Sequence, residues 1–345
     1  MRVSEGLSSV FENLRQLLEA PNADEPALIK PVAVAKLPKI KTPKQPKETG
    51  SWKLCILLPD AQIGFRRYAD NVLDPFHDVT TLQLAYTIMT HLEKEYGIDL
   101  VVNLGDTMDL PMFGKYEQEV SFARTVQATL QAGHNYMAMQ RAIAPEAEIV
   151  FIEGNHDCRL ERHIRSVSPS LQELRQIDNE SYPVLSMPHL MQFDALNITY
   201  AGAYPAAEFW INKRLVAVHG TRANSNGSTS VQYANKQPLH STVFGHSHRS
   251  DLYYKTHHTA SGPVENVAFS PGCLCRIDGA VPSVKGGVGM NERPAIRYED
   301  WQQGMAVVWY KDDGDFDIQP IHIHGAGKME RWAVYAGKEF RVPVE

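Results

Sequence analysis

Side chains that can bind a metal ion follow five apolar runs of this sequence. In chain order they are Asp60 and Gln62, Asp106 and Asp109, Asn155 and His156, His219, and His246 and His248. Carboxylate, carboxamide and imidazole donors without a thiolate suit Mn²⁺, Fe or Zn²⁺ better than Cu⁺ or an iron–sulfur cluster. Two such ions side by side can clamp the attacking and leaving oxygens of an in-line phosphoryl displacement. The residue types therefore favour a dinuclear centre.

The apolar runs that precede these residues are typical of buried strands, because they are short and rich in β-branched and aromatic residues. They cover residues 54–58, 100–104, 149–152, 215–218 and 242–244. Ligand sites of open α/β sheets lie at the carboxyl ends of the strands, which is where these polar side chains fall. The predicted helices cover 78–96 and about 119–142, and a third opens within 157–164. Residues 184–218 and the chain from Tyr253 onward are interpreted as strands, which predicts an α/β domain with a second sheet.

The first 50 residues differ in composition from the rest. Apolar residues recur at helical spacing within 1–19, which predicts a short amphipathic helix. Prolines and six lysines follow within 20–50, which is typical of an extended linker or a basic arm. We therefore expect a helix and arm over residues 1–50 and one folded domain over residues 51–345.

The bulk composition limits the class of protein. The formal net charge is −6 and the sequence pI is about 6.2, which argues against a protein coated in basic charge. No apolar segment reaches the ~18 residues of a membrane span, so we expect no membrane partner and a cytoplasmic location. The four cysteines form no secreted-type framework. Cys273 and Cys275 leave two interpretations, a zinc-binding pair or buried small hydrophobes, and we favour the second.

The five polar clusters together resemble the motifs of calcineurin-like metallophosphoesterases. They read Asp60-Ala61-Gln62, Gly105-Asp106-Thr107-Met108-Asp109, Gly154-Asn155-His156-Asp157, His219-Gly220 and Gly245-His246-Ser247-His248. The resemblance covers about residues 52–250 in order. It implies a four-layer α/β/β/α sandwich that carries two divalent ions at its strand ends. We expect Mn²⁺, with Fe or Zn²⁺ as alternatives, in the cytosol of a bacterium or of a phage-infected host.

The resemblance also implies a role for each motif residue. Asp60, Gln62 and His248 would hold one ion, Asn155, His219 and His246 the other, and Asp106 would bridge the two. A bridging hydroxide would be the nucleophile. His156 would assist the leaving oxygen, and Asp109 would orient His156.

Gln62 departs from the family pattern, which usually has His at this position. A carboxamide oxygen is a weaker donor to a transition metal than an imidazole, so we expect lower affinity at that ion and a preference for Mn²⁺. The alternative is a protein that has lost one ion and its activity.

The residues at positions 110 and 157 indicate which branch of the family the sequence resembles. Ser/Thr protein phosphatases have Glu where Asp157 stands and Arg where Leu110 stands. The sequence instead resembles the nuclease and phosphodiesterase branches. It is also similar to metallophosphoesterases encoded by bacteriophages, through Gly272-Cys273-Leu274-Cys275-Arg276 and Trp301-Gln302-Gln303-Gly304.

Arginines close to the motifs are candidates for substrate contact. Arg159 and Arg162 would share a helix face just after Asp157, and Arg222 follows His219. Guanidinium groups bind phosphate oxygens in a bidentate manner, although surface pairing with acids is the alternative. We therefore expect hydrolysis of a phosphodiester, in DNA, RNA or a nucleotide. The alternatives are a phosphomonoesterase and a non-catalytic binding protein with a degraded metal site, and the sequence does not indicate an oligomeric state.

Overall fold

The computed structural model describes residues 51–68, 71–114, 119–178, 181–224, 227–282, 299–325 and 330–343. The helix expected within 1–19 and the arm of 20–50 lie outside the described residues, and the domain boundary at residue 51 stays a prediction. No helix among the described residues combines the length and apolar character needed to cross a membrane.

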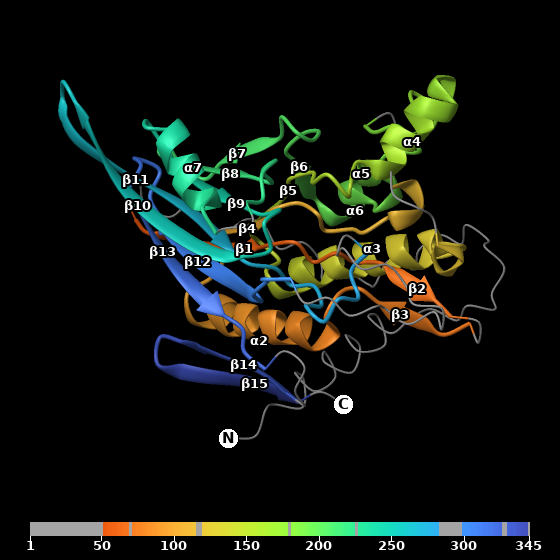
Figure 1. Cartoon of the computed structure of the whole chain (residues 1–345), viewed down its shortest axis with the longest axis horizontal. Helices are drawn as coiled ribbons and strands as arrows, with labels where there is room; N and C mark the ends of the chain where they lie inside the picture. The colour runs from red at the N-terminus through yellow and green to blue at the C-terminus, as the bar shows by residue number, and fades with distance from the viewer. Residues whose placement is uncertain are drawn as a thin grey trace.

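Two β-sheets form the centre of the protein (Figure 1). The six-stranded sheet, in the order β13-β12-β1-β4-β5-β6, consists of β1 (Lys53–Leu58), β4 (Leu100–Asn103), β5 (Glu148–Phe151), β6 (Ile198–Tyr200), β12 (Gly304–Tyr310) and β13 (Phe316–His322). The five-stranded sheet, in the order β10-β11-β9-β8-β7, consists of β7 (Glu208–Trp210), β8 (Leu215–Val218), β9 (Ser241–Phe244), β10 (Ser250–Thr259) and β11 (Gly262–Pro271). Strands β1, β4, β5 and β6 run parallel, as do β8, β9 and β11. Parallel neighbours bring their carboxyl ends to one edge of each sheet.

Strand β1 shows why its sequence is apolar at every position. Leu54 and Ile56 pack on the helical side of the first sheet, while Cys55 and Leu57 pack between the two sheets. Both faces of the strand are buried, so both sets of side chains must be apolar. The same division recurs along β4 and β5 and produces two separate hydrophobic layers.

Helices cover the outer faces of both sheets. Helices α2 (Val79–Glu95) and α3 (Val126–Ile143) contribute to the core of the first sheet, and α7 (Thr229–Lys236) packs on β9, β10 and β11. In Figure 1 the order is α7, second sheet, first sheet, then α2 and α3. The side chain of Asp78 caps α2 by accepting a hydrogen bond from the backbone N–H of Thr81 at 3.0 Å. The predicted four-layer α/β/β/α architecture is therefore confirmed.

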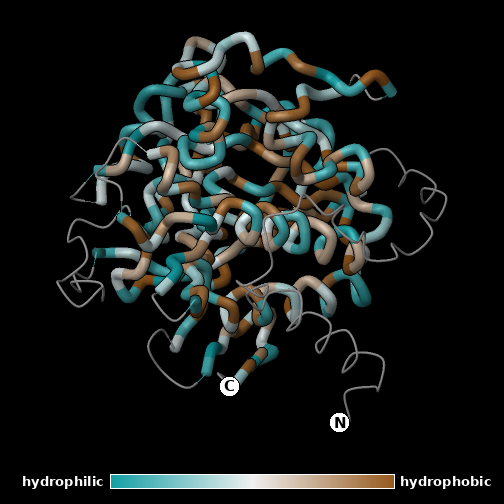
Figure 2. Tube along the Cα trace, turned by 90° about the vertical axis from the view of Figure 1, so that its right-hand side faces the viewer, coloured by the Kyte–Doolittle hydropathy of each residue, from teal (hydrophilic) through white to brown (hydrophobic). Residues whose placement is uncertain are grey.

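Smaller elements complete the described part of the chain. They are the hairpin of β2 (Phe65–Arg67) and β3 (Leu73–Pro75), the hairpin of β14 (Glu330–Tyr335) and β15 (Lys338–Pro343), α4 (Arg159–Val167), and the 3₁₀ turns η1 (Pro111–Phe113), η2 (Val120–Phe122) and η3 (Pro169–Leu171). The β14–β15 hairpin packs on α2. Apolar segments gather inside the body, with hydrophilic ones toward its outside (Figure 2).

Two secondary-structure predictions need correction. The helix expected from about residue 119 begins only at Val126, because a 3₁₀ turn and the left-handed Arg124 (φ 59°) precede it. The stretch 184–218 is not all strand. It first forms α5 (Met187–Leu190) and α6 (Phe193–Leu196), and the side chain of Ser186 caps α5.

Candidate active site

The predicted metal ligands lie where the carboxyl ends of the two parallel sets of strands meet. Asp60 and Gln62 follow β1, Asp106 follows β4, Asn155 follows β5, His219 follows β8, and His246 and His248 follow β9. Five of these seven residues have a left-handed backbone: Asp60 (φ 35°), Gln62 (φ 49°), Asp106 (φ 46°), His246 (φ 66°) and His248 (φ 55°). Each such residue costs on the order of 1 kcal/mol, and strain of this kind gathers at functional sites.

Two groups of donors share one carboxylate. Asp106, His219 and His246 place ligand atoms within 4.8 Å of one another, and so do Asp60, Asp106 and His248. Asp106 belongs to both groups. Its Oδ2 atom lies 3.4 Å from Nε2 of His219, while Nε2 of His248 lies 3.2 Å from Oδ1 of Asp60. The arrangement fits two metal ions with Asp106 between them.

The carboxamides complete these two groups. Oδ1 of Asn155 lies 3.1 Å from Nε2 of His219, on the side of the first group. Nε2 of Gln62 lies 3.3 Å from Oδ2 of Asp106 and 3.4 Å from Nε2 of His248, on the side of the second. Oε1 of Gln62 is buried and has no hydrogen-bond partner among the described residues. A half-turn of the amide would direct this oxygen at the donors, so an ion there would satisfy a group that is otherwise unpaired.

His219 is oriented for ligation by a backbone carbonyl. Its Nδ1 atom donates to the carbonyl oxygen of Leu104 at 2.8 Å, which leaves Nε2 with a lone pair that faces Asp106 and Asn155. Metal-binding histidines commonly have their other ring nitrogen fixed in this way. The neighbouring loop is held as well, since the backbone N–H of His246 donates to both oxygens of Asp60 at 3.0 and 3.1 Å.

The charges of the site depend on one another. Burial would lower the pKa of His219, but the Asp106 carboxylate outweighs this effect and raises it to about 9. Burial and the charge on His219 lower the pKa of His246 to about 4. Burial would raise the pKa of Asp106, yet the imidazoles of His156 and His219 hold it well below its usual range. The Asp106 carboxylate is thus ionised, and a dication bound beside it would compete with the proton for Nε2 of His219.

His156, Asp109 and Arg159 form a hydrogen-bonded trio beside the donors. Nδ1 of His156 lies 3.0 Å from Oδ1 of Asp109, as expected for a carboxylate that orients an imidazole. The guanidinium of Arg159 donates to the same oxygen at 2.6 Å and to Nε2 of His156 at 3.0 Å. Arg159 therefore contacts the residues predicted to be catalytic.

Asp157 connects the loops. Its two carboxylate oxygens accept hydrogen bonds from the backbone N–H groups of Met108 and Gly154, both at 2.8 Å. The loop after β4 is thereby tied to the loop after β5. Close packing reinforces this link, because a Cβ atom at Gly154 would lie only 2.1 Å from the backbone nitrogen of Asp106. The motif thus contributes more than Asn155 and His156, because its glycine and its aspartate hold the backbone of the two loops together.

The other two predicted substrate contacts lie farther from the trio. The guanidinium of Arg162 lies over the ring of Tyr204 at 5.3 Å, and that ring makes an edge contact with His219. Arg222 is exposed and donates to Oε1 of Gln232 at 3.4 Å. Arg159 and Arg162 do not act on one common partner, although helical spacing places them on one face.

Aromatic and sulfur neighbours of the metal ligands were not anticipated as part of the site. The ring of Trp301 lies 4.2 Å from the ring of His248 between centroids, and Sγ of Cys275 lies 3.9 Å from Nδ1 of His248. Both come from chain segments after the last motif. The available signals were the alternation of Cys273 and Cys275 and the resemblance of both segments to bacteriophage enzymes, but nothing in the sequence connected them with His248.

Comparison with known proteins agrees with the geometry. No curated protein matches the sequence. The family model for calcineurin-like phosphoesterases matches residues 76–277, which is more than half of the chain. With its shared Asp106 and its strand-end histidines, this protein belongs to the calcineurin-like phosphoesterase family of metal-dependent hydrolases.

Proposed function

We propose that the protein hydrolyses a phosphodiester, in a nucleic acid or a nucleotide, with two divalent ions bound at the candidate site. The observation that supports this proposal most directly is the position of Asp106 in both donor groups. Ions bound there would supply Lewis-acid activation of water and of the phosphoryl oxygens. Mn²⁺ suits the oxygen-rich donor set with its one carboxamide in place of a histidine.

The residues of the trio would act on the leaving oxygen. With Nδ1 facing Asp109, His156 presents Nε2 for proton transfer to that oxygen. In this structure Arg159 donates a hydrogen bond to Nε2 of His156. The leaving oxygen of the substrate would replace that hydrogen bond, while the guanidinium keeps its bond to Asp109. We assign Arg159 to positioning His156 and Asp109, and we retain Arg162 and Arg222 as candidate substrate contacts.

The state of the nearby arginines supports a diester over a monoester. Around the site the guanidinium of Arg159 is engaged by Asp109, and that of Arg249 lies 3.4 Å from a carboxylate oxygen of Asp300. A phosphomonoester dianion needs more compensating positive charge than a diester monoanion does. Because the guanidinium groups of Arg159 and Arg249 are already paired with carboxylates, these two cations offer less free charge to a dianion, which favours the singly charged diester.

The test compares bis-p-nitrophenyl phosphate with p-nitrophenyl phosphate in the presence of added Mn²⁺. We expect diester cleavage that falls by about 10²-fold or more in His156→Ala and is abolished in Asn155→Ala. His258→Ala, an exposed histidine in the β10–β11 hairpin, is the control and should retain activity. Monoester cleavage alone would make the protein a phosphatase, and no cleavage with Mn²⁺, Fe²⁺ or Zn²⁺ would indicate a binding protein.

A second measurement addresses nucleic acid. If DNA or RNA is the substrate, Arg162→Gln and Arg222→Gln should raise KM for the polymer and reduce its dependence on salt. The same variants should leave KM for the small diester unchanged. Equal effects on both substrates would argue for a nucleotide. The cytosolic location expected from the sequence stays a prediction.

A further inference from the structure

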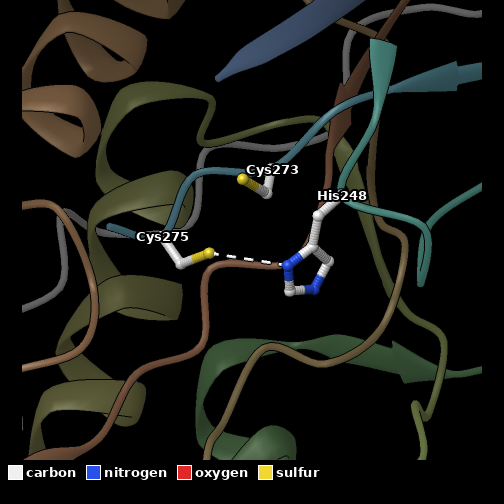
Figure 3. Close-up of side chains that lie close together, drawn as sticks. All are labelled: His248, Cys273 and Cys275. Carbon is white, nitrogen blue, oxygen red and sulfur yellow. Dashed lines mark hydrogen bonds between the residues drawn. The ribbon is translucent and has the colours of Figure 1, made fainter. Parts of the chain in front are cut away.

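Two thiols lie against one of the predicted metal ligands. Sγ of Cys273, Sγ of Cys275 and a ring nitrogen of His248 all lie within 4.8 Å of one another. Figure 3 shows the three side chains close together, with the sulfur of Cys275 facing Nδ1 of His248 at 3.9 Å. All three side chains are buried, the two cysteines completely. Two sulfurs and one imidazole are the donors that zinc and its heavier relatives prefer.

The backbone that carries the thiols is fixed at every residue. The backbone N–H of Cys273 donates to the carbonyl oxygen of Gln302 at 2.9 Å, and that of Leu274 donates to the carbonyl oxygen of Asp60 at 3.2 Å. The carboxamide of Gln303 donates to the carbonyl oxygen of Cys275 at 2.8 Å. These bonds hold the two thiols on the same side of the chain. A site built on such a scaffold loses little conformational freedom when a ligand binds.

The surroundings favour a neutral complex. Phe76, Phe122 and Val281 form one buried cluster with the two cysteines, and Trp301 packs against it. An isolated charge would be costly in such an apolar place. A dication with two thiolates and one neutral imidazole has no net charge, whereas a hard ion such as Mn²⁺ lacks the oxygen donors it prefers here.

We propose that Cys273, Cys275 and Nδ1 of His248 form a binding site for a thiophilic divalent ion, Zn²⁺ or Cd²⁺. The site is separate from the oxygen-rich groups around Asp106, since it uses the opposite ring nitrogen of His248. Nε2 of the same imidazole lies 3.2 Å from Oδ1 of Asp60. One histidine thus faces both sites. A neutral imidazole has only one lone pair, so an ion held by Nδ1 requires the ring proton to move to Nε2, and His248 is then lost as a ligand beside Asp60. If the proposed phosphodiesterase function holds, binding at the thiol site will therefore inhibit hydrolysis.

The experiment titrates the full-length, Mn²⁺-loaded protein with Cd²⁺ and follows ultraviolet thiolate-to-metal charge-transfer absorption. Oxygen and nitrogen ligands give no such absorption, so Cd²⁺ that merely replaces Mn²⁺ at the oxygen-rich groups around Asp106 does not contribute to the signal. We expect saturation at about one equivalent in the wild type. We expect the absorption to be lost in Cys273→Ser/Cys275→Ser and kept in Cys55→Ala, whose thiol is equally buried but lies between the two sheets.

If the double variant does not fold, X-ray absorption at the cadmium edge of the wild type still decides the proposal. It counts the sulfur atoms around the bound cadmium directly. Two sulfur neighbours are expected. No sulfur neighbour, no charge-transfer absorption, or unchanged absorption in the folded double variant would overturn the proposal. Both readouts are independent of hydrolysis, so they decide this proposal even where the phosphodiesterase assay fails. Where that assay succeeds, Cd²⁺ should inhibit the wild type more strongly than Cys275→Ser.

Discussion

The backbone N–H of His156 donates to Oδ1 of Asp106 across 2.7 Å, and this bond joins the loop after β5 to the loop after β4. The other oxygen of Asp106, Oδ2, faces Nε2 of His219 at 3.4 Å and the carboxamide of Gln62 at 3.3 Å. The two oxygens of one carboxylate thus have different partners. One fixes the residue proposed to assist the leaving group, and the other faces both donor groups. Displacement of Asp106 should disturb both at once.

Gly154→Ala tests this coupling. The added Cβ would lie 2.1 Å from the backbone nitrogen of Asp106 and 2.3 Å from its Oδ1, so the Asp106 loop must move. Because small displacements of a site can cost about 10²-fold in rate, we expect kcat to fall by that order and metal affinity to fall with it. Steady-state kinetics and metal titration measure the two effects.

Gly262→Ala is the control for Gly154→Ala. Among the residues that the structure describes, none has an atom within 4 Å of a Cβ placed at Gly262, but the φ of +111° at Gly262 makes the substitution strained. It should therefore lower thermal stability and leave kcat and metal affinity unchanged. If Gly154→Ala retained both wild-type kcat and wild-type metal affinity, the tight contact with Asp106 would have no functional role.

Arg159→Gln separates positioning from substrate binding. The guanidinium contacts Asp109 and His156, so its loss should disorder the imidazole and lower kcat on the order of tenfold or more, with KM nearly unchanged. Arg159→Lys should recover little of the lost kcat, since an ammonium group cannot reproduce the hydrogen bonds that the guanidinium donates to Asp109 and His156. Kinetics on the small diester with saturating Mn²⁺ provide the measurement. A raised KM with unchanged kcat would return Arg159 to the role of substrate contact that the sequence suggested.

Much of the site follows from the sequence because the strands are parallel. The apolar runs before Asp60, Asp106 and Asn155 have no polar alternation, and strands of that kind are buried on both faces and run side by side. Polar residues that follow such strands must meet at one edge. The order of the motifs therefore predicts which residues converge, and the structure brings together all seven predicted ligands.

Side-chain partners could not be predicted in the same way. Helical spacing placed Arg159 and Arg162 on one face as candidate substrate contacts, but Arg159 instead pairs with the buried carboxylate of Asp109, which lies within its reach. Short elements were also missed. The Ser186 cap followed by Pro188 is a helix-start signal that the apolar pattern of 184–218 concealed.

Gln62→His tests the departure from the family pattern. Gln62 is fully buried beside His248 and Asp106, so an imidazole there would add a stronger donor than the carboxamide. We expect tighter binding of Zn²⁺ by about tenfold or more, with a smaller gain for Mn²⁺. Calorimetric titration of the metal-free protein gives both affinities, and Gln319→His, placed on β13, controls for the addition of a histidine elsewhere in the fold. Equal affinities in wild type and Gln62→His would remove Gln62 as a determinant of metal preference.

His134 should make the fold sensitive to acid. Its ring is 1% exposed within α3, and Nδ1 lies 2.9 Å from the carbonyl oxygen of Met191. Burial lowers the pKa of His134 below the ordinary 6.5, and the Met191 carbonyl offsets only part of this effect. As the pH falls, the unfolded chain takes up a proton on His134 before the folded chain does. The contribution of neutral His134 to the free energy of unfolding is therefore fully present above about pH 6.5 and is lost as the pH drops below it. In urea unfolding, His134→Asn should lose less stability between pH 7.5 and pH 5 than the wild type. The exposed His258→Asn should follow the wild type. Parallel curves for wild type and His134→Asn would show that His134 titrates alike in the folded and unfolded chains.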